Sequence, residues 1–349
     1  MTTLRRLALL LLALLAGISS PHAQEEGGEL RLSLPTENDA LFRGGGAAFY
    51  QHIRRDYKGV ISFPWQGGQY GFVRNPVETA SGLVYSRFHE GMDIRPVRRD
   101  ARGEPLDPVR AIAEGKVVHI NLVPGYSNYG KYVVVEHRWG GSSYYSLYGH
   151  LATVTTSEGA KLERGEQLGV MGYTGEGLDQ SRAHVHVELN LLLSRNFESW
   201  HEAFFKSDPN RHGLYNGINL TGIDLPKLLQ ALRKRSALTI PEFLEDEDVF
   251  YRVALPPSAN FDLPRRYPWL LKSSTDEAAQ GWEVSFNRAG VPLRVKPLES
   301  AVAAPTLTYV DKRSGDYSDA TRGVIGGSGA GAHLTASGQR LIRLLIWPD

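Results

Sequence analysis

The sequence has 349 residues, of which 42% are hydrophobic, and its formal net charge at pH 7 is +1. A chain of this length can bury the cores of more than one domain, and its balanced charge gives no electrostatic indication of a nucleic acid partner. The chain contains no cysteine, which excludes a disulfide framework, a thiolate metal site, a cysteine nucleophile and a lipidated N-terminal cysteine.

Residues 1–23 have the pattern of a secretory signal peptide. Arg5 and Arg6 precede a short apolar run at residues 7–16, and Ala23 stands directly before a polar stretch. These are the marks of an exported protein, so we expect cleavage after Ala23 and an extracytoplasmic location, in the periplasm or outside the cell. An uncleaved anchor is the alternative. No other apolar run is long enough for a membrane span, so none is expected after cleavage.

Residues 24–82 contain turn signals, such as the glycines at 44–46, and aromatic clusters. We expect a short helix near residues 47–55 and strands after it. This segment is predicted to pack on the following domain.

A histidine and an aspartate four residues apart open the part of the chain that carries the chemistry. His89 and Asp93 would share a face on a helix, but Gly91 between them and Pro96 after them favour an extended or turning segment. Along a straight strand the two side chains begin roughly 13 Å apart, whereas zinc ligands lie about 2.0–2.2 Å from the ion. If both bind one ion, the chain must bend, and Gly91 can supply the bend.

His150 follows an aromatic, β-prone run and stands in the sequence Tyr-Gly-His-Leu. The preceding glycine places it at a strand end or on a turn, from which it can face a groove. As an isolated feature it would be a surface or hydrogen-bonded histidine. His119 and His137 lie in valine-rich runs and are interpreted as structural.

A later run places two histidines and a glutamate at alternate positions among valines. In a β-strand such residues share a face, so His184, His186 and Glu188 project side by side. One interpretation is a half-exposed strand whose polar face meets solvent. The other joins this strand to His89 and Asp93, because two imidazoles and a carboxylate, with a fourth position open for water, form the ligand set of a catalytic zinc site.

Together, His89-x-x-x-Asp93, the segment around His150 and His184-x-His186 resemble the lysostaphin-type zinc metallopeptidases, which cut peptide bonds in bacterial cell-wall peptidoglycan. The combination is specific, whereas each histidine motif alone is weak. The resemblance covers residues 83–193 and continues, in the family's order, through residues 107–112, 114–118, 128–137, 164–169 and 172–175.

The resemblance implies roles for five residues. His89, Asp93 and His186 match the zinc ligands of the family. His150 and His184 match the two histidines that line its cleft as catalytic groups. The family's usual His-Leu-His-Phe-Glu is His-Val-His-Val-Glu in this chain, an apolar exchange that keeps the alternation.

Some members of the family keep an N-terminal segment that covers the zinc cleft. The resemblance therefore implies two alternatives for residues 24–82, which either pack on the catalytic domain or cover its cleft. In a covering segment Asn38 or Asn75 could reach the ion, although packing alone is the favoured interpretation.

This sequence departs from the family at the edges of the groove. Arg182 and Ala183 replace the Gly-Pro that commonly precedes the last motif, and an insertion at residues 98–105 lengthens the loop after the first ligands. This loop is basic and contains Arg95, Arg98, Arg99 and Arg102. Most basic runs are solvated surface, yet the guanidinium groups of this loop could pair with carboxylates of peptidoglycan stem peptides. The departures bear on substrate preference more than on activity.

The predicted fold class is mainly β. Residues 83–194 alternate valine- and tyrosine-rich runs with glycine-containing turns, which predicts an antiparallel all-β domain. The resemblance implies that this domain has the antiparallel β-sheet groove of the lysostaphin-type peptidase fold. Such a groove suits an extended peptide. Residues 195–224 form an extension, and residues 225–349 form an α/β C-terminal module to which no function is assigned. Its expected elements are a helix at residues 225–234 capped by Asp224, a hairpin at 282–295, and a helix or buried strand at 339–347.

The expected function is that of a secreted or periplasmic zinc endopeptidase acting on peptidoglycan cross-links. Zn²⁺ would polarise the scissile carbonyl and lower the pKa of its bound water toward about 7. His150 and His184 would exchange protons with that water or with the leaving amine, and the sequence leaves open which of them is the base. Glu188 either orients a ligand or faces solvent.

Two other functions fit part of the pattern. A catalytically silent module of the same fold would bind peptidoglycan and activate another wall hydrolase, but silent relatives typically lose ligands, and all five positions are filled here. A β-barrel iron oxygenase also uses two histidines and a carboxylate, but the secretory signal and the His150 segment argue against it. The sequence leaves the cleaved bond and the oligomeric state open.

Overall fold

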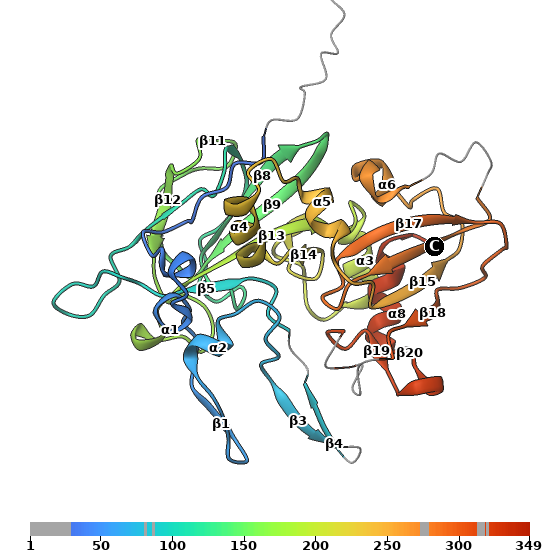
Figure 1. The fold of residues 1–349 in the computed structure, drawn as a ribbon, viewed down its shortest axis with the longest axis horizontal. Coiled ribbons are helices and arrows are strands. Elements are labelled where there is room, and N and C mark those ends of the chain that lie inside the picture. Colours follow the sequence, from blue (N-terminus) through green and yellow to red (C-terminus); the bar gives the residue numbers. More distant parts are fainter. Residues whose placement is uncertain (1–28, 80–81, 86–87, 273–278, 313–317, 319–320) are drawn as a thin grey trace, which may run out of the picture.

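The computed structural model of the chain describes residues 29–79, 82–85, 88–272, 279–312, 318 and 321–349. The expected signal peptide lies outside these residues. The described chain consists mainly of antiparallel strands, which confirms the predicted mainly β class. Figure 1 shows a large sheet on one side of the molecule and a smaller sheet, built near the C-terminus, on the other.

The largest sheet has seven strands in the order β11-β7-β8-β9-β13-β14, and β5 also pairs with β13. Its valine- and tyrosine-rich strands have the composition that favours pleated, buried structure. They are β5 (Met92–Ile94), β7 (Gly115–Asn121), β8 (Tyr132–Trp139), β9 (Ser142–Gly149), β11 (Lys161–Leu162), β13 (Val185–Leu192) and β14 (Leu220–Gly222). A three-stranded sheet beside it is formed by β6 (Pro108–Arg110), β10 (Leu151–Val154) and β12 (Gln167–Met171).

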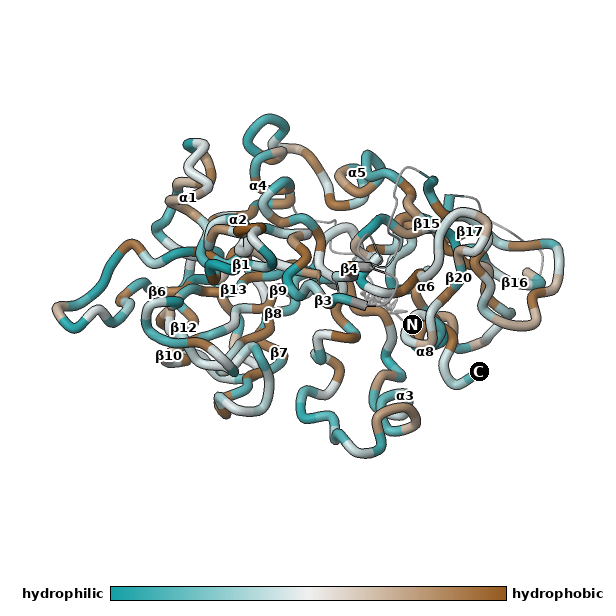
Figure 2. Tube along the Cα trace, turned by 90° about the horizontal axis from the view of Figure 1, so that it is seen from below, coloured by the Kyte–Doolittle hydropathy of each residue, from teal (hydrophilic) through white to brown (hydrophobic). Residues whose placement is uncertain are grey.

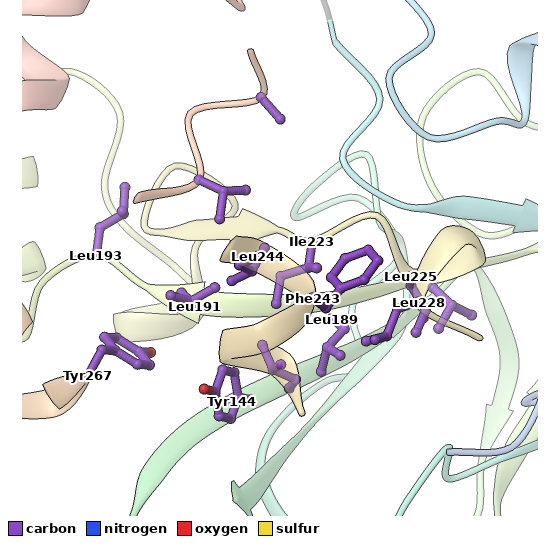
Figure 3. Packing of buried hydrophobic residues seen from close by; sticks show 14 of the residues in the cluster. Tyr144, Leu189, Leu191, Leu193, Ile223, Leu225, Leu228, Phe243, Leu244 and Tyr267 are labelled. Atoms are coloured by element: carbon purple, nitrogen blue, oxygen red, sulfur yellow. The ribbon is translucent and has the colours of Figure 1, made fainter. Parts of the chain in front are cut away.

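Strand β13 is buried on both faces. On one face its apolar side chains, among them Leu189 and Leu191, pack under helices α4 (Leu225–Lys234) and α5 (Ile240–Glu245), as Figure 3 shows. A shift of one residue would move this apolar set to the other face, so the packing fixes the register of β13. The alternate residues are thereby directed to the opposite side of the sheet.

Helix α4 matches the helix predicted from the sequence. It begins after Asp224, whose side chain accepts a hydrogen bond from the amide of Lys227 at 3.0 Å, and Leu225 and Leu228 are buried. The helix expected at residues 47–55 is wrong in extent, because α1 spans only Gly46–Phe49. The chain becomes extended at Tyr50, where it pairs with Ile94 of β5 instead of continuing the helix.

The C-terminal module contains a four-stranded antiparallel sheet in the order β17-β16-β15-β18. The predicted hairpin is present as β16 and β17, and the last predicted element is helix α8. Besides α4 and α5, its elements are β15 (Tyr251–Leu255), α6 (Leu263–Arg266), β16 (Gly281–Phe286), β17 (Pro292–Leu298), β18 (Thr306–Val310), β19 (Ile325–Gly326), β20 (His333–Leu334) and α8 (Ala336–Leu344). The preceding extension contains helix α3 (Phe197–Phe204), which contacts α8.

The C-terminal module contacts the end of β13 through hydrogen bonds and apolar packing. Tyr267 accepts a hydrogen bond from the amide of Leu192 at 2.9 Å, and the guanidinium of Arg266 donates to the carbonyls of Leu192 and Leu193. One continuous apolar cluster runs from the large sheet into this module. Figure 2 shows hydrophobic stretches among the central strands and hydrophilic stretches in several outer loops.

The N-terminal segment contributes helix α2 (Pro64–Gly67) and two hairpins that project from the same side of the molecule (Figure 1). Backbone before the first hairpin, at Tyr50 and Gln51, and between the two hairpins, at Gly68, pairs with β5 through hydrogen bonds. The hairpins are β1 (Arg55–Tyr57) with β2 (Val60–Ser62), and β3 (Pro76–Thr79) with β4 (Gly82–Tyr85).

Within the described residues, none of the helices has the length and hydrophobicity that crossing a membrane requires.

Candidate active site

The polar face of β13 carries the histidines predicted from the sequence. His184, His186 and Glu188 are only 1%, 4% and 0% exposed. The alternative of a half-exposed strand is therefore wrong. Strand β5 pairs with this part of β13, and the register places Asp93 directly opposite His186.

Three potential metal ligands converge at this point. His186 Nδ1 lies 2.8 Å from Asp93 Oδ1, and His89 Nε2 lies 3.1 Å from each of these two atoms. The donors of a tetrahedral zinc site lie about 3.3 Å apart. The triangle therefore fits a zinc ion after a small expansion, and its donor atoms are of the types that zinc prefers.

Gly91 allows this convergence. The chain bends at this residue, as the sequence predicts. A Cβ atom at position 91 would lie 2.5 Å from the carbonyl oxygen of Val187 and 2.9 Å from the His186 ring. Only a glycine lets this loop approach β13 so closely, so the residue is required for space.

A hydrogen bond on the second ring nitrogen orients each of the two histidines of the triangle. His89 Nδ1 lies 2.8 Å from the carbonyl oxygen of Gln69, which can only accept, so Nδ1 carries the hydrogen and Nε2 offers its lone pair. His186 Nε2 lies 2.7 Å from the carboxylate of Glu188, which also accepts from Tyr129. Glu188 therefore does not face solvent. It orients His186, as carboxylates commonly orient metal-binding histidines.

The electrostatics of the triangle favour a cation. Burial lowers the pKa of His89 to about 4, so its ring is neutral at pH 7 and able to bind a metal. Burial also acts to lower the pKa of His186, but the carboxylates of Asp93 and Glu188 outweigh it and raise that pKa to about 10. A metal ion bonded to Nδ1 would supply the positive charge that these two carboxylates attract.

Two residues near Asp93 were missed in the sequence analysis. Arg74 Nη2 lies 2.5 Å from Asp93 Oδ2, and the same guanidinium donates to the carbonyl of Gly67. His52 Nδ1 lies 3.5 Å from the same carboxylate oxygen, and His52 is 8% exposed. Burial acts to raise the pKa of Asp93, but its cationic and imidazole neighbours, including His89 and Arg74, hold it well below the usual range.

The N-terminal segment also holds Asp93 through its backbone. The amide of Gln51 donates to the Asp93 carbonyl at 3.1 Å, and the Asp93 amide donates to the Gly68 carbonyl at 3.0 Å. The side chain of Asn38 donates to the carbonyls of Ala48 and Arg95, and that of Asn75 accepts from Arg55. The groups that this segment brings to Asp93 are thus Arg74 and His52, together with main-chain atoms.

His150 and His184 face each other beside the triangle, with ring centroids 4.6 Å apart. His150 Nδ1 lies 2.8 Å from the Thr174 carbonyl, and His184 Nδ1 lies 2.6 Å from the Arg182 carbonyl. Because carbonyls only accept, the Nε2 atom of each neutral ring is unprotonated. Burial lowers the pKa of both histidines, so both are neutral at pH 7 and can accept a proton.

The backbone of His150 is in the left-handed region, with φ of 61°. A non-glycine residue rarely adopts this conformation, which costs on the order of 1 kcal/mol or more. The amide of His150 donates to the Tyr129 carbonyl at 2.7 Å, directly after strand β9 ends. The predicted position at a strand end is therefore correct, and the strained backbone turns the ring toward His184.

A cavity of about 610 Å³ opens beside the triangle and has His186, Arg74 and Glu90 in its lining. This volume suits a small ligand or a few residues of a peptide. The arginines of the loop after Asp93 are not among the lining residues. Instead, Arg98 lies 3.7 Å from Glu37, and Arg99 donates to the carbonyls of Gly103 and Gln180.

Replacement of Arg74 by glutamine is expected to weaken zinc affinity by about 10- to 100-fold, because Asp93 loses the partner that fixes its second oxygen. Lysine at this position keeps the charge without the planar fork, so an intermediate affinity is expected. Competition with a chromophoric chelator measures the change. Arg54→Gln, at an exposed arginine of the same segment, is the control. Equal affinity in wild type and Arg74→Gln would contradict a role for Arg74 in holding the ligand.

Residues 87–196 match the family model described as Peptidase family M23. This match confirms the resemblance to the lysostaphin-type peptidases for that part of the chain. A curated relative, the peptidoglycan DD-endopeptidase ShyA of Vibrio cholerae serotype O1, is 33% identical over 148 residues. The aligned region makes up 38% of this chain and 32% of the relative, so the chain spans about a third of the relative's length.

Two of the similar solved structures are of proteins described as peptidases. A zinc-containing peptidase from Vibrio cholerae is 22% identical, with 41% of this chain and 36% of that chain covered and a TM-score of 0.26. The catalytic domain of the antimicrobial peptidase lysostaphin from Staphylococcus simulans is 24% identical, with 34% of this chain and 76% of that chain covered and a TM-score of 0.24.

Proposed function

We propose that the chain is a zinc-dependent endopeptidase that hydrolyses peptide bonds in peptidoglycan cross-links. The observation that carries the proposal is the approach of three donor atoms, from His89, Asp93 and His186, to within 3.1 Å of one another beside two neutral histidines. The match of residues 87–196 to a peptidase family supports the reaction class. The relative named a peptidoglycan DD-endopeptidase supports the substrate.

The three donors would hold Zn²⁺, which supplies Lewis acidity to the scissile carbonyl and to the attacking water. The chain's own groups have separate tasks around it. Glu188 keeps His186 Nδ1 directed at the ion, and Arg74 keeps Asp93 Oδ1 directed there. Each ligand is thus held by a partner that does not itself bind the metal.

Proton transfer falls to His150 and His184. In each ring Nδ1 is committed to a carbonyl, so Nε2 is the atom that can take a proton from water. The protonated ring can then donate to the leaving amine or to the developing oxyanion. Because burial keeps both rings neutral at pH 7, a proton acceptor is present under ordinary conditions.

An extracytoplasmic location is part of the proposal. The pattern of residues 1–23 is that of a secretory signal, and a wall peptidase must reach peptidoglycan outside the membrane. A DD-endopeptidase of peptidoglycan among the relatives is consistent with this location.

A catalytically silent wall-binding module is less well supported. Such a module has no need for a full set of ligands, yet the three donors, the two further histidines and their orienting partners are all in place. The orienting groups Arg74 and Glu188 are informative here, because each holds a side chain of the donor triangle, Arg74 that of Asp93 and Glu188 that of His186. We therefore favour an active enzyme.

The test is hydrolysis of purified peptidoglycan by the mature protein, with product masses and metal analysis. We expect bound zinc, release of peptides with new amine ends, loss of hydrolysis on chelation, and recovery when zinc is restored. Bound iron instead of zinc would point to the oxygenase alternative. Stoichiometric zinc without hydrolysis would contradict the proposal and favour the silent module.

A further inference from the structure

The cavity beside the triangle is shared by distant parts of the chain. Its catalytic side includes His186 and Glu90, and its volume of about 610 Å³ is that of a ligand site. The opposite wall comes from the extension and from the C-terminal module, to which no function is otherwise assigned. This wall includes Phe205, Arg211, Ala289, Arg322, Val324 and Leu341.

Arg322 is the cation that the C-terminal module places in this wall. It is half-buried, and its guanidinium lies over the Phe88 ring at 5.8 Å from the centroid. Within the described residues it forms no ion pair with a carboxylate. Phe88 directly precedes the ligand His89, so Arg322 stacks on the segment that carries the site. A half-buried guanidinium without an acidic partner is suited to bind an anion.

The turn that carries Arg322 is strained and firmly held. Its φ of 58° lies in the left-handed region, which an arginine rarely adopts. The hydroxyl of Thr335, at the start of α8, donates to the Gly323 carbonyl at 2.7 Å, and the Ile325 amide donates to the hydroxyl of Thr321 at 3.0 Å. Strain that the surrounding structure maintains at a cavity wall points to a functional position.

A second cation borders the same cavity. Arg211 of the extension lies over the Tyr126 ring at 5.0 Å from its centroid, and it is exposed. Two acids, Glu90 and Asp208, also line the cavity. Apart from Arg74, whose guanidinium is already paired, the cavity thus offers two guanidinium groups together with aromatic surface, a combination that suits a peptide bearing carboxylates.

We propose that Arg322 of the C-terminal module binds a carboxylate of the peptide that occupies the cavity, with Arg211 as a second cation on its exposed side. This inference rests on the proposed function, because the peptide is the substrate of the same site. The C-terminal module then selects peptides with free carboxylates over peptides in which those groups are amidated.

The test compares two synthetic stem peptides, one with free carboxylates and one with the same groups as carboxamides. Binding is measured by calorimetry with the full-length, zinc-loaded protein carrying His150→Asn, so that the peptide is not consumed. Addition of Arg322→Gln is expected to weaken the Kd for the acidic peptide by about 10- to 100-fold and to leave the amidated peptide unaffected. Arg322→Lys, which keeps the charge, is expected to lose less.

Arg252→Gln is the matched control. Arg252 belongs to the same module, is half-buried and stacks over Tyr309 at 4.8 Å, but it does not line the cavity. This variant is expected to bind both peptides as the parent does. Unchanged binding of the acidic peptide in Arg322→Gln, or equal weakening for both peptides, would overturn the inference.

The inference and the proposed function can fail separately. If the wild type does not hydrolyse peptidoglycan but the charge-dependent effect of Arg322→Gln persists, the peptidase assignment fails and the carboxylate site stands. If hydrolysis occurs and Arg322→Gln shows no preference between the two peptides, only the inference about the C-terminal module fails.

Discussion

Substitution of His186 by alanine is expected to remove bound zinc and to lower kcat/KM on peptidoglycan peptides by about 10³-fold or more. His186 supplies one of the three donor atoms and lies between Asp93 and Glu188, at hydrogen-bond distances of 2.8 and 2.7 Å. Without it, two donors remain and the buried carboxylate of Glu188 loses its imidazole partner. Metal content by mass spectrometry and initial hydrolysis rates measure the two effects.

His119→Ala is the control for the loss of a strand histidine. His119 lies on β7, outside the group of side chains that converges on the metal position, and its variant is expected to keep zinc and activity. Circular dichroism establishes that both variants are folded. A folded His186→Ala protein with a full zinc complement and near wild-type rates would show that His186 is not a ligand.

Substitution of His150 by asparagine is expected to lower kcat by about 10²- to 10⁴-fold while zinc content stays unchanged. Asparagine tolerates the left-handed backbone of this position, where φ is 61°, better than most residues. Its amide can still donate to the Thr174 carbonyl but cannot accept a proton at neutral pH. The variant therefore removes the proton acceptor and keeps the local structure.

The matching variant His184→Asn separates the two histidines. Whichever variant loses the acidic limb of the pH–rate profile identifies the base, and the other residue then acts on the leaving group or the oxyanion. If His150→Asn retains a rate within a few-fold of wild type, His150 does not transfer a proton. If it loses zinc, His150 belongs to the metal site instead.

Much of the site could be predicted because it lies on one strand and one short loop. The alternation of His184, His186 and Glu188 is a local property of a β-strand, and the buried apolar partners of β13 make the register certain. The helix after Asp224 could be predicted for a similar reason, because its capping residue and its row of leucines lie within a few residues of one another in the sequence.

Other parts could not be predicted because they depend on contacts between distant segments. Nothing near Arg74 in the sequence indicates that it pairs with Asp93, and His52 stands alone among aromatic and basic residues. Arg322 reaches the cavity only because the C-terminal module is fastened to the end of β13. The loop arginines near Asp93 looked more suitable in sequence, yet their contacts lie within the protein.

The main-chain hydrogen bonds of Asp93 with residues 51 and 68 also decide how short a fragment of this chain can be and still hold the triangle together. The family match begins at residue 87. The backbone of β5, however, forms hydrogen bonds with residues that precede this point in the chain. A fragment cut at the start of the match would leave these backbone groups open and would lack the carbonyl that sets the tautomer of His89. We therefore expect that a fragment has to include the N-terminal segment if it is to keep the geometry of the triangle.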